Sequence, residues 1–250
     1  IVTPFEAVTG MYSLPGRHDI DPTAILAPFY FLFFGLMLSD AAYGLILTTL
    51  CAIILKKYKP EGTTHRMIKM FMFCGLSTFM WGALFGGWFG NFFTVAAKTF
   101  FGKEFVIKPL WFDPLSEPMK LLVVSLILGA IHLFVGMGVQ AYMDIKDGRP
   151  LDALFDIGLW YLLLIGIVLF AFGGKLGAGA VGIGKIMAII GAVGILLTGG
   201  RKKKGIFGKL TGGLGSLYGI TSYLSDVLSY SRLLALGLAT GVVAQVFNTL

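Results

Sequence analysis

The feature that most constrains this sequence is an arginine inside a long apolar segment. Arg232 lies in a stretch that extends from about Leu210 to Leu250. A helix of that length would span about 60 Å and would place Arg232 about 27 Å or more from either end. The hydrocarbon core of a bilayer is only about 30 Å thick, so the side chain cannot reach water by snorkelling. We therefore expect Arg232 to be held within the membrane and to stay charged at any physiological pH.

The cost of this placement favours a functional role for the charge. Moving an arginine to the centre of a bilayer costs at least about 2.5–3.5 kcal/mol, and by some estimates more than about 10 kcal/mol. The alternative interpretation is a structural arginine that binds backbone carbonyls inside a helix bundle. Position and charge alone leave both interpretations open.

Composition places the chain in the class of polytopic membrane proteins. Of its 250 residues 56% are hydrophobic and only 13% are charged, and the mean hydropathy is +0.84, which excludes an ordinary soluble domain. The basic residues cluster at segment ends, so they indicate membrane topology and not a nucleic-acid partner. The sequence contains no P-loop, dinucleotide fingerprint, nucleophile elbow or metal-binding Cys/His cluster. No catalytic, cofactor-binding or metal-binding residue is predicted.

The hydropathy pattern predicts an all-α protein with seven transmembrane helices. The expected helices cover residues 23–38, 44–57, 67–97, 119–143, 154–173, 179–199 and 211–250, and the last is long and tilted. Residues 1–21 are expected to form an amphipathic entry segment before a transmembrane domain at residues 22–250. The first apolar stretch would span about 50 Å as one helix. We therefore divide it at Ser39–Gly44 into a short hairpin, whereas an undivided stretch would give six spans.

Charge distribution favours the seven-span topology weakly. With seven spans, 13 basic residues lie on one side of the membrane and 6 on the other, and with six spans the numbers are 12 and 7; these are the 20 Lys and Arg without Arg232. The positive-inside rule then places the N-terminus in the cytoplasm. The chain starts at Ile1 and stops at Leu250 inside an apolar helix, so we expect a fragment of a longer protein.

Several polar residues accompany Arg232 on the last predicted helix. At about 100° per residue, Tyr218, Ser225, Ser229 and Thr240 fall within about 80° of Arg232. Such a stripe can admit water or allow a partner helix to come close. Asp226 lies about a third of a turn off this face, where it either lines an aqueous vestibule or pairs with another helix.

Two further polar residues have competing interpretations. Asp40 lies at the proposed break in the first stretch, where it either caps the second helix or marks the mouth of an ion path. His132 lies inside the predicted 119–143 helix and is either a hydrogen-bonded packing residue or a proton relay.

One string around Arg232 resembles a family signature. Residues 229–239 read SYSRLLALGLA, which is similar to the S-Y-x-R-L-x-A-L-x-L-A pattern of the membrane subunit a, or subunit I, of V-type and A-type rotary ATPases. Three other strings are similar to segments of the same family. They are FG followed by SDAAYG at residues 34–44, GWFGN at 87–91 and GAIH at 129–132.

This resemblance implies a function and partners. Arg232 would be the stator arginine that drives H⁺ or Na⁺ from a carboxylate on a proteolipid rotor ring and blocks leakage between two half-channels. The chain would hold the first seven helices of an eight-helix domain and would be non-catalytic. A missing cytoplasmic N-terminal domain would contact peripheral stalks, and a soluble V1/A1 sector would carry the ATPase activity. The compact connection at residues 98–118 is similar to prokaryotic members, which implies a prokaryotic cell membrane.

Two other classes of function compete with this one. A secondary transporter or channel would use Arg232 to bind an anionic substrate and would work without partners. A purely structural assembly protein would show no transport defect after removal of the Arg232 charge. Copurification with a proteolipid ring and stalk proteins distinguishes the classes.

Overall fold

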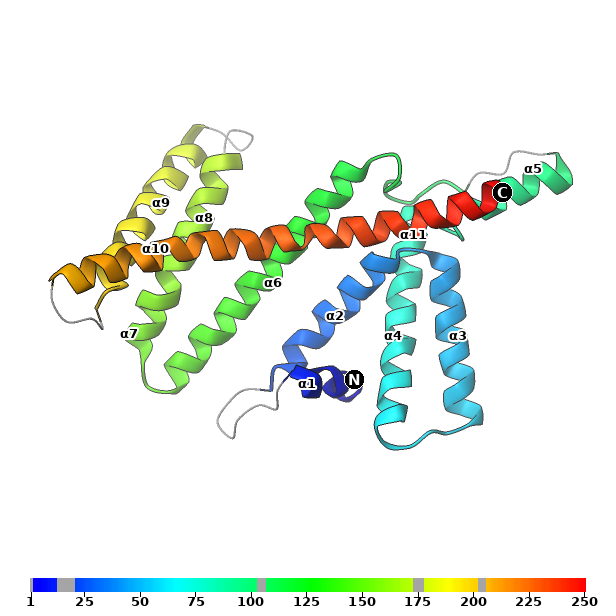
Figure 1. Ribbon diagram of the computed structural model, residues 1–250, viewed down its shortest axis with the longest axis horizontal. Coiled ribbons are helices and arrows are strands. Elements are labelled where there is room, and N and C mark those ends of the chain that lie inside the picture. The colour runs from blue at the N-terminus through cyan, green and yellow to red at the C-terminus, as the bar shows by residue number, and fades with distance from the viewer. Residues whose placement is uncertain (1, 13–20, 103–106, 173–177, 202–205) are drawn as a thin grey trace. The chain divides into compact units, whose positions relative to one another are not determined.

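The computed structural model describes residues 2–12, 21–102, 107–172, 178–201 and 206–250 (Figure 1). Within these ranges the regular structure is helical, which confirms the predicted all-α class. The chain divides into two compact units, one formed by residues 1–127 with 230–250 and the other by residues 128–229. Some basic residues used in the charge argument lie outside the described residues. They are Arg17, Lys103, Lys175, Lys202, Lys203 and Lys204. Most of the predicted connection at 174–178 also lies outside the described residues.

The first unit contains the predicted short hairpin. Helix α2 covers Thr23–Leu38 and helix α3 covers Ala41–Lys57, so the division of the first apolar stretch is correct. Helix α3 starts three residues earlier than expected. With 16 and 17 residues, the two helices are about 24 and 26 Å long, slightly less than the hydrocarbon thickness.

The third predicted helix, at residues 67–97, is wrong as a single element. The structure has helix α4 at Gly62–Phe85, a turn, and helix α5 at Phe92–Phe101. Gly86 ends α4 in the left-handed conformation with φ 74°, which is the usual way for glycine to terminate a helix. Helix α5 then runs across the direction of α4 (Figure 1). Apolar composition continues through this turn, so hydropathy alone does not reveal it.

Glycines allow α4 to pack closely against the hairpin. A Cβ atom on Gly82 would collide with the backbone nitrogen of Ala41, and one on Gly44 would collide with the backbone nitrogen of Phe79. Lipid tails are as apolar as the helix surfaces, so no hydrophobic force drives helices together in a membrane. Helices associate there through this kind of close van der Waals packing. The backbones of α3 and α4 are therefore in close contact along the length of the pair.

The entry segment packs on the same unit. The 3-10 turn Thr3–Phe5 and helix α1, Glu6–Tyr12, lie against α2 and α4, with Phe5 buried beside Ala27 and Cys74. The hydroxyls of Thr9 and Thr23 are 2.8 Å apart. Hydrogen bonds from the side chain and backbone N–H of Thr23 lower the pKa of the Asp21 carboxyl, which lies just before α2.

The second unit consists of helices packed around one core. Helix α6, Pro118–Lys146, begins in the first unit and continues here. It is followed by α7 (Pro150–Ala153), the π-helical turn η2 (Leu154–Gly158), α8 (Leu159–Phe172), α9 (Ala178–Thr198) and α10 (Ile206–Ser229). Trp160, Leu163 and Ile195 are buried in the core. Gly166 and Gly191 let α8 and α9 approach closely, because a Cβ on either would meet backbone at 2.5–2.8 Å.

The last predicted helix, 211–250, is interrupted at Tyr230. Helix α10 ends at Ser229 and helix α11 covers Ser231–Thr249. Ser229 Oγ donates a 2.7 Å hydrogen bond to the Asp226 carbonyl, the acceptor that the N–H of Tyr230 would otherwise use in a regular helix. Tyr230 keeps right-handed dihedral angles of φ −70° and ψ −9°. The interruption is therefore local.

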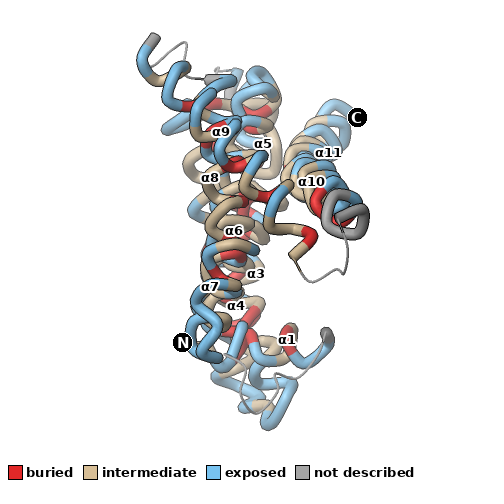
Figure 2. The backbone as a smooth tube through the Cα atoms, turned by 90° about the vertical axis from the view of Figure 1, so that its left-hand side faces the viewer, coloured by how far each residue is buried: buried red, intermediate tan, exposed pale blue. Residues whose placement is uncertain are grey.

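The helices have the length and surface of membrane spans. In the part of the chain that the structure describes, five stretches are long and apolar enough to cross a bilayer, and α2 is a shorter apolar helix. Much of each helix is exposed or only partly buried (Figure 2). Large apolar side chains such as Leu197 and Phe247 are exposed. A surface of this kind suits lipid as the solvent. The chain is a polytopic helical membrane protein, and the number of seven spans stays a prediction.

Candidate functional site

The site in the first unit is built around Asp40, at the tip of the α2–α3 hairpin. The Asp40 side chain is 3% exposed, and its Oδ1 accepts hydrogen bonds from the backbone N–H groups of Ala42 and Tyr43 at 3.0 and 3.2 Å. These are the orphan donors of the first turn of α3, so Asp40 is the N-cap that one sequence interpretation expected. Ser39, with φ 38°, supplies the left-handed residue that reverses the chain before it.

Asp40 also binds the turn between α4 and α5, which the sequence did not predict. Its Oδ2 accepts from the N–H of Gly90 at 3.0 Å, and the N–H of Ala41 donates to the carbonyl of Gly87 at 2.8 Å. We call residues 86–91 the GWFGN turn, from the sequence of its last five members. The hairpin tip and this turn are therefore held together by one side-chain and one backbone hydrogen bond.

Helix α11 packs on α2 and on the GWFGN turn through one of its faces. Leu233, Gly237 and Ala244 of α11 are buried. A Cβ on Gly237 would lie 3.2 Å from the carbonyl oxygen of Leu36, which shows how closely the two helices approach. At the start of this face, the ring centroids of Tyr230 and Phe33 are 5.3 Å apart.

Arg232 lies on the other side of α11. At about 100° per residue, it is rotated by between about 120° and 180° from Gly237, Gly241, Ala244 and Asn248, which form or adjoin the packed face. Arg232 is exposed in the chain, and so are Ala235, Leu236, Ala239, Val242, Val243 and Val246, which follow it along the same side. The helix thus presents one cation at the end of an apolar stripe.

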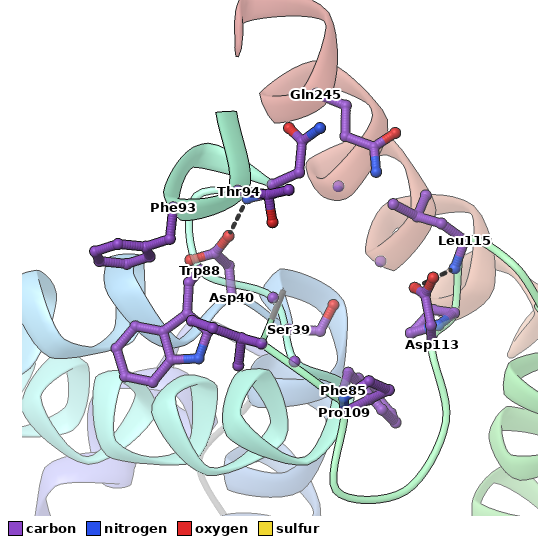
Figure 3. Close-up of a pocket in the computed structure, with 18 of the residues that line it drawn as sticks. Ser39, Asp40, Phe85, Trp88, Phe93, Thr94, Pro109, Asp113, Leu115 and Gln245 are labelled. Carbon is purple, nitrogen blue, oxygen red and sulfur yellow. Dashed lines mark hydrogen bonds between the residues drawn. The ribbon is translucent and has the colours of Figure 1, made fainter. Parts of the chain in front are cut away.

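A cavity of about 210 Å³ lies between the GWFGN turn, the α2–α3 tip and the packed side of α11 (Figure 3). Ser39, Asp40, Thr94, Asp113 and Gln245 contribute polar side chains to its lining. Asp113 forms a turn before α6 by accepting the N–H of Leu115 at 3.0 Å. The volume and lining suit several water molecules near two carboxylates, a medium that favours cations over anions.

The structure divides the remaining predicted residues between the units. Thr240 lies on α11 with Arg232 in the first unit, where its Oγ1 donates to the carbonyl of Leu236 at 3.1 Å. The predicted residues of α10 belong to the second unit. They are the exposed Tyr218, Ser225 and Asp226, and the half-buried Ser229. His132 is half-buried on α6, also in the second unit. Neither interpretation of Asp226 or of His132 is tested by this arrangement.

The second unit contains an ion cluster that sequence reasoning missed. Arg201 Nη2 lies 2.5 Å from Asp152 Oδ1 and 2.9 Å from Asp156 Oδ2, and the guanidinium lies 5.4 Å from the centre of the Phe155 ring. This pairing joins the end of α9 to η2. Within the described part of the chain, no group of three His, Cys, Asp or Glu side chains could hold a metal ion.

The fold defines the class: a polytopic helical membrane protein, with one arginine on an exposed face of α11. Comparison with known proteins narrows this class. The chain is 33% identical to A-type ATP synthase subunit I of Methanocaldococcus jannaschii, over 99% of the chain and 38% of the relative. It is 35% identical to A-type ATP synthase subunit I of Thermococcus kodakarensis, over 99% of the chain and 36% of the relative.

A bacterial relative extends the comparison. The chain is 23% identical to V-type ATP synthase subunit I of Borreliella burgdorferi, over 95% of the chain and 40% of the relative. No protein-family model matches the chain. It spans little more than a third of the length of these relatives. The chain belongs to the family of A-type and V-type ATP synthase subunit I, as the resemblance of residues 229–239 implied.

Proposed function

We propose that this chain is part of the stator of a rotary A/V-type ATPase and forms the ion path against a proteolipid rotor ring. The observation that carries the proposal is the position of Arg232 on the exposed face of α11, opposite the face packed on α2. An arginine on an apolar helix face attracts an acidic group of a protein that packs on this face, and a rotor carboxylate is such a group. The names of the relatives, subunit I of A-type and V-type ATP synthases, support membership in such a complex.

Arg232 acts on the rotor carboxylate through charge. A rotor carboxylate crosses lipid only when protonated or occupied by Na⁺, because a bare charge there is too costly. Near Arg232 the ionised carboxylate is favoured, so the ion leaves into one half-channel. The emptied carboxylate passes the arginine and is refilled from the other half-channel. The fixed cation repels an ion that would cross directly, which limits leakage.

The cavity beside α11 supports an aqueous vestibule on one side of this path. Asp40 and Asp113 give it a negative potential that concentrates H⁺ or Na⁺, and Gln245 brings a polar side chain from α11 to its wall. In this role Asp40 acts through its field while its oxygens cap α3. Ser225, Ser229, Asp226 and Tyr218 of the second unit are proposed to line a half-channel, and Thr240 of the first unit to lie on the ion path beside Arg232. His132 is proposed to be a packing residue of the second unit.

The orientation and partners complete the proposal. The predicted excess of basic residues on one side supports a cytoplasmic N-terminus, and the compact connection at residues 98–118, similar to prokaryotic members, supports a prokaryotic cell membrane. The missing part of the protein includes an N-terminal domain that contacts peripheral stalks, and the chain itself is non-catalytic. ATP is hydrolysed or made in the soluble A1/V1 sector.

The test replaces Arg232 in the full-length chain within the assembled complex. We expect Arg232→Ala to abolish ATP-driven ion transport into proteoliposomes while ATP hydrolysis and assembly persist. Arg232→Lys should also fail or leak, because lysine can lose its proton in this setting. Arg149→Ala is the matched control, since Arg149 pairs only loosely with Asp144 and Asp147 and is 54% exposed. Normal pumping by Arg232→Ala would refute the proposal, and ion or anion transport by the chain without partners would favour a secondary transporter or channel.

A further inference from the structure

The GWFGN turn is fixed by α11 as well as by the hairpin tip. Asn248, in the last turn of α11, donates through Nδ2 to the carbonyl of Phe89 at 2.8 Å and to Asn91 Oδ1 at 3.0 Å. The Phe89 carbonyl can only accept, so the amide nitrogen of Asn248 must face it. One side-chain NH₂ group therefore binds the end of α11 to both Phe89 and Asn91 of the turn.

Gly90 makes this contact possible. Its φ is 64°, and a Cβ at this position would lie 3.0 Å from Ala244 Cβ and 3.1 Å from the backbone nitrogen of Gln245. The absence of a side chain lets α11 lie directly on the turn. The N–H of the same Gly90 binds Asp40 Oδ2. The turn is thus held between the hairpin tip on one side and α11 on the other, all within the first unit.

These contacts fix two different coordinates of α11. Leu233, Gly237 and Ala244 bury one face and so set the rotation of the helix about its axis. Small residues such as Gly237 and Ala244 project little from the helix surface. This face therefore offers little resistance to sliding of α11 along its own axis. Asn248 forms directional hydrogen bonds that are lost after a shift of about 1 Å along the axis. A helix is stiff along its axis, so a fixed Asn248 fixes Arg232, about 24 Å away.

We propose that Asn248 is a positioning residue that sets the depth of Arg232 in the membrane by anchoring α11 to the GWFGN turn. The inference rests on the function proposed above, because depth matters only if Arg232 meets a passing rotor carboxylate. Their Coulomb attraction falls in inverse proportion to distance, and a displacement by one helical turn is about 5.4 Å. A stator helix that slides under load would meet the carboxylate at the wrong level and uncouple rotation from ion transfer.

The functional test uses the assembled complex with the full-length chain. Asn248→Leu keeps a side chain of similar size but removes both donors. Thr249→Val is the matched control, because the Thr249 hydroxyl binds only carbonyls of its own helix, those of Gln245 and Val246. We expect Asn248→Leu to lower the number of ions moved per ATP hydrolysed at least about threefold with hydrolysis retained, and Thr249→Val to leave that ratio unchanged.

A direct measurement of register separates positioning from general damage. Disulfide formation is compared for Phe33→Cys with Tyr230→Cys, the native neighbours, and for Phe33→Cys with Leu234→Cys, one helical turn away. The native Cys51 and Cys74 are replaced by alanine. We expect Asn248→Leu to raise the ratio of displaced to native cross-link several-fold, and Thr249→Val to leave it unchanged.

The outcomes are distinguishable. Normal coupling in Asn248→Leu overturns the proposal, and so does reduced coupling with an unchanged cross-link ratio. A changed cross-link ratio together with normal pumping by Arg232→Ala shows that the anchor exists while the proposed stator function fails. A changed ratio, reduced coupling and loss of pumping in Arg232→Ala support both.

Discussion

Replacing Asp40 by asparagine separates the two interpretations of this residue. Asp40 Oδ1 caps α3 through Ala42 and Tyr43, while Oδ2 accepts the N–H of Gly90. Asparagine is as good an N-cap as aspartate. Its single oxygen can keep the cap, but its NH₂ group then faces the N–H of Gly90. The substitution therefore removes one hydrogen bond selectively and leaves the start of α3 intact.

The hydrogen bonds give the expected magnitude. A hydrogen bond to a charged acceptor contributes about 1.5–3 kcal/mol, and here the Gly90 N–H is left unsatisfied beside a side chain that is 3% exposed. We expect Asp40→Asn to lower the free energy of unfolding by about 2–3 kcal/mol. Asp40→Ala also loses the cap, which adds about 1 kcal/mol. Asp147→Asn is the control, because Asp147 is 53% exposed and its pair with Arg149 contributes about 0–1 kcal/mol.

The assay is reversible unfolding of the chain in bicelles by SDS, followed by tryptophan fluorescence. Transport by the assembled complex is measured for the same variants. If Asp40 is structural, stability falls in the order wild type, Asp40→Asn, Asp40→Ala, and transport falls with it. Unchanged stability of Asp40→Asn, within about 0.5 kcal/mol, together with lost transport would refute the structural reasoning and assign the carboxylate to the ion path.

Two other predictions concern packing and charge. Gly82→Ala should destabilise the first unit by about 1–3 kcal/mol in the same titration, because its Cβ would collide with the backbone at Ala41. The control Gly136→Ala should be neutral or stabilising, because a Cβ at this position would have nothing within 4 Å. Arg201→Leu should cost about 1–3 kcal/mol by removing the cation that pairs with the partly buried Asp152 and the more exposed Asp156. Adding Asp152→Asn should recover part of that loss, and strict additivity of the two changes would contradict the pairing.

The sequence predicted the helices wherever hydropathy and length were sufficient. The first stretch was too long for one span, and the short SDAAYG string gave the position of the break, which the structure has at Ser39 and Asp40. The turn after Phe85 was missed because the residues on both sides are apolar and aromatic. Gly86, Gly87, Gly90 and Asn91 mark it, but glycines are so frequent in this chain that a few of them carry little information.

The site could be predicted only in part, for a related reason. Arg232 and Asp40 stand out because a charge is rare in an apolar stretch and its cost demands an explanation. The amide residues of the site are uncharged, and placing them near the end of a helix costs little free energy. Their residue type therefore does not indicate a site in the sequence. They are Asn248, Asn91 and Gln245. Their roles come from contacts between segments about 160 positions apart, such as Asn248 with Phe89. The pairing of Arg201 with Asp152 is equally non-local.

The distribution of directional bonds explains how one helix can be both fixed and functional. In the first unit α11 is fixed through its packed face, from Tyr230 beside Phe33 to Asn248 on the GWFGN turn. The Arg232 face carries alanine, valine and leucine, whose side chains form no directional bonds and slide past an apolar partner at low cost. The proposed contact with a moving rotor requires such a surface, with one charge held at constant depth. The proposed anchor then has to lie on the far side of the helix, which is the side where Asn248 binds the GWFGN turn.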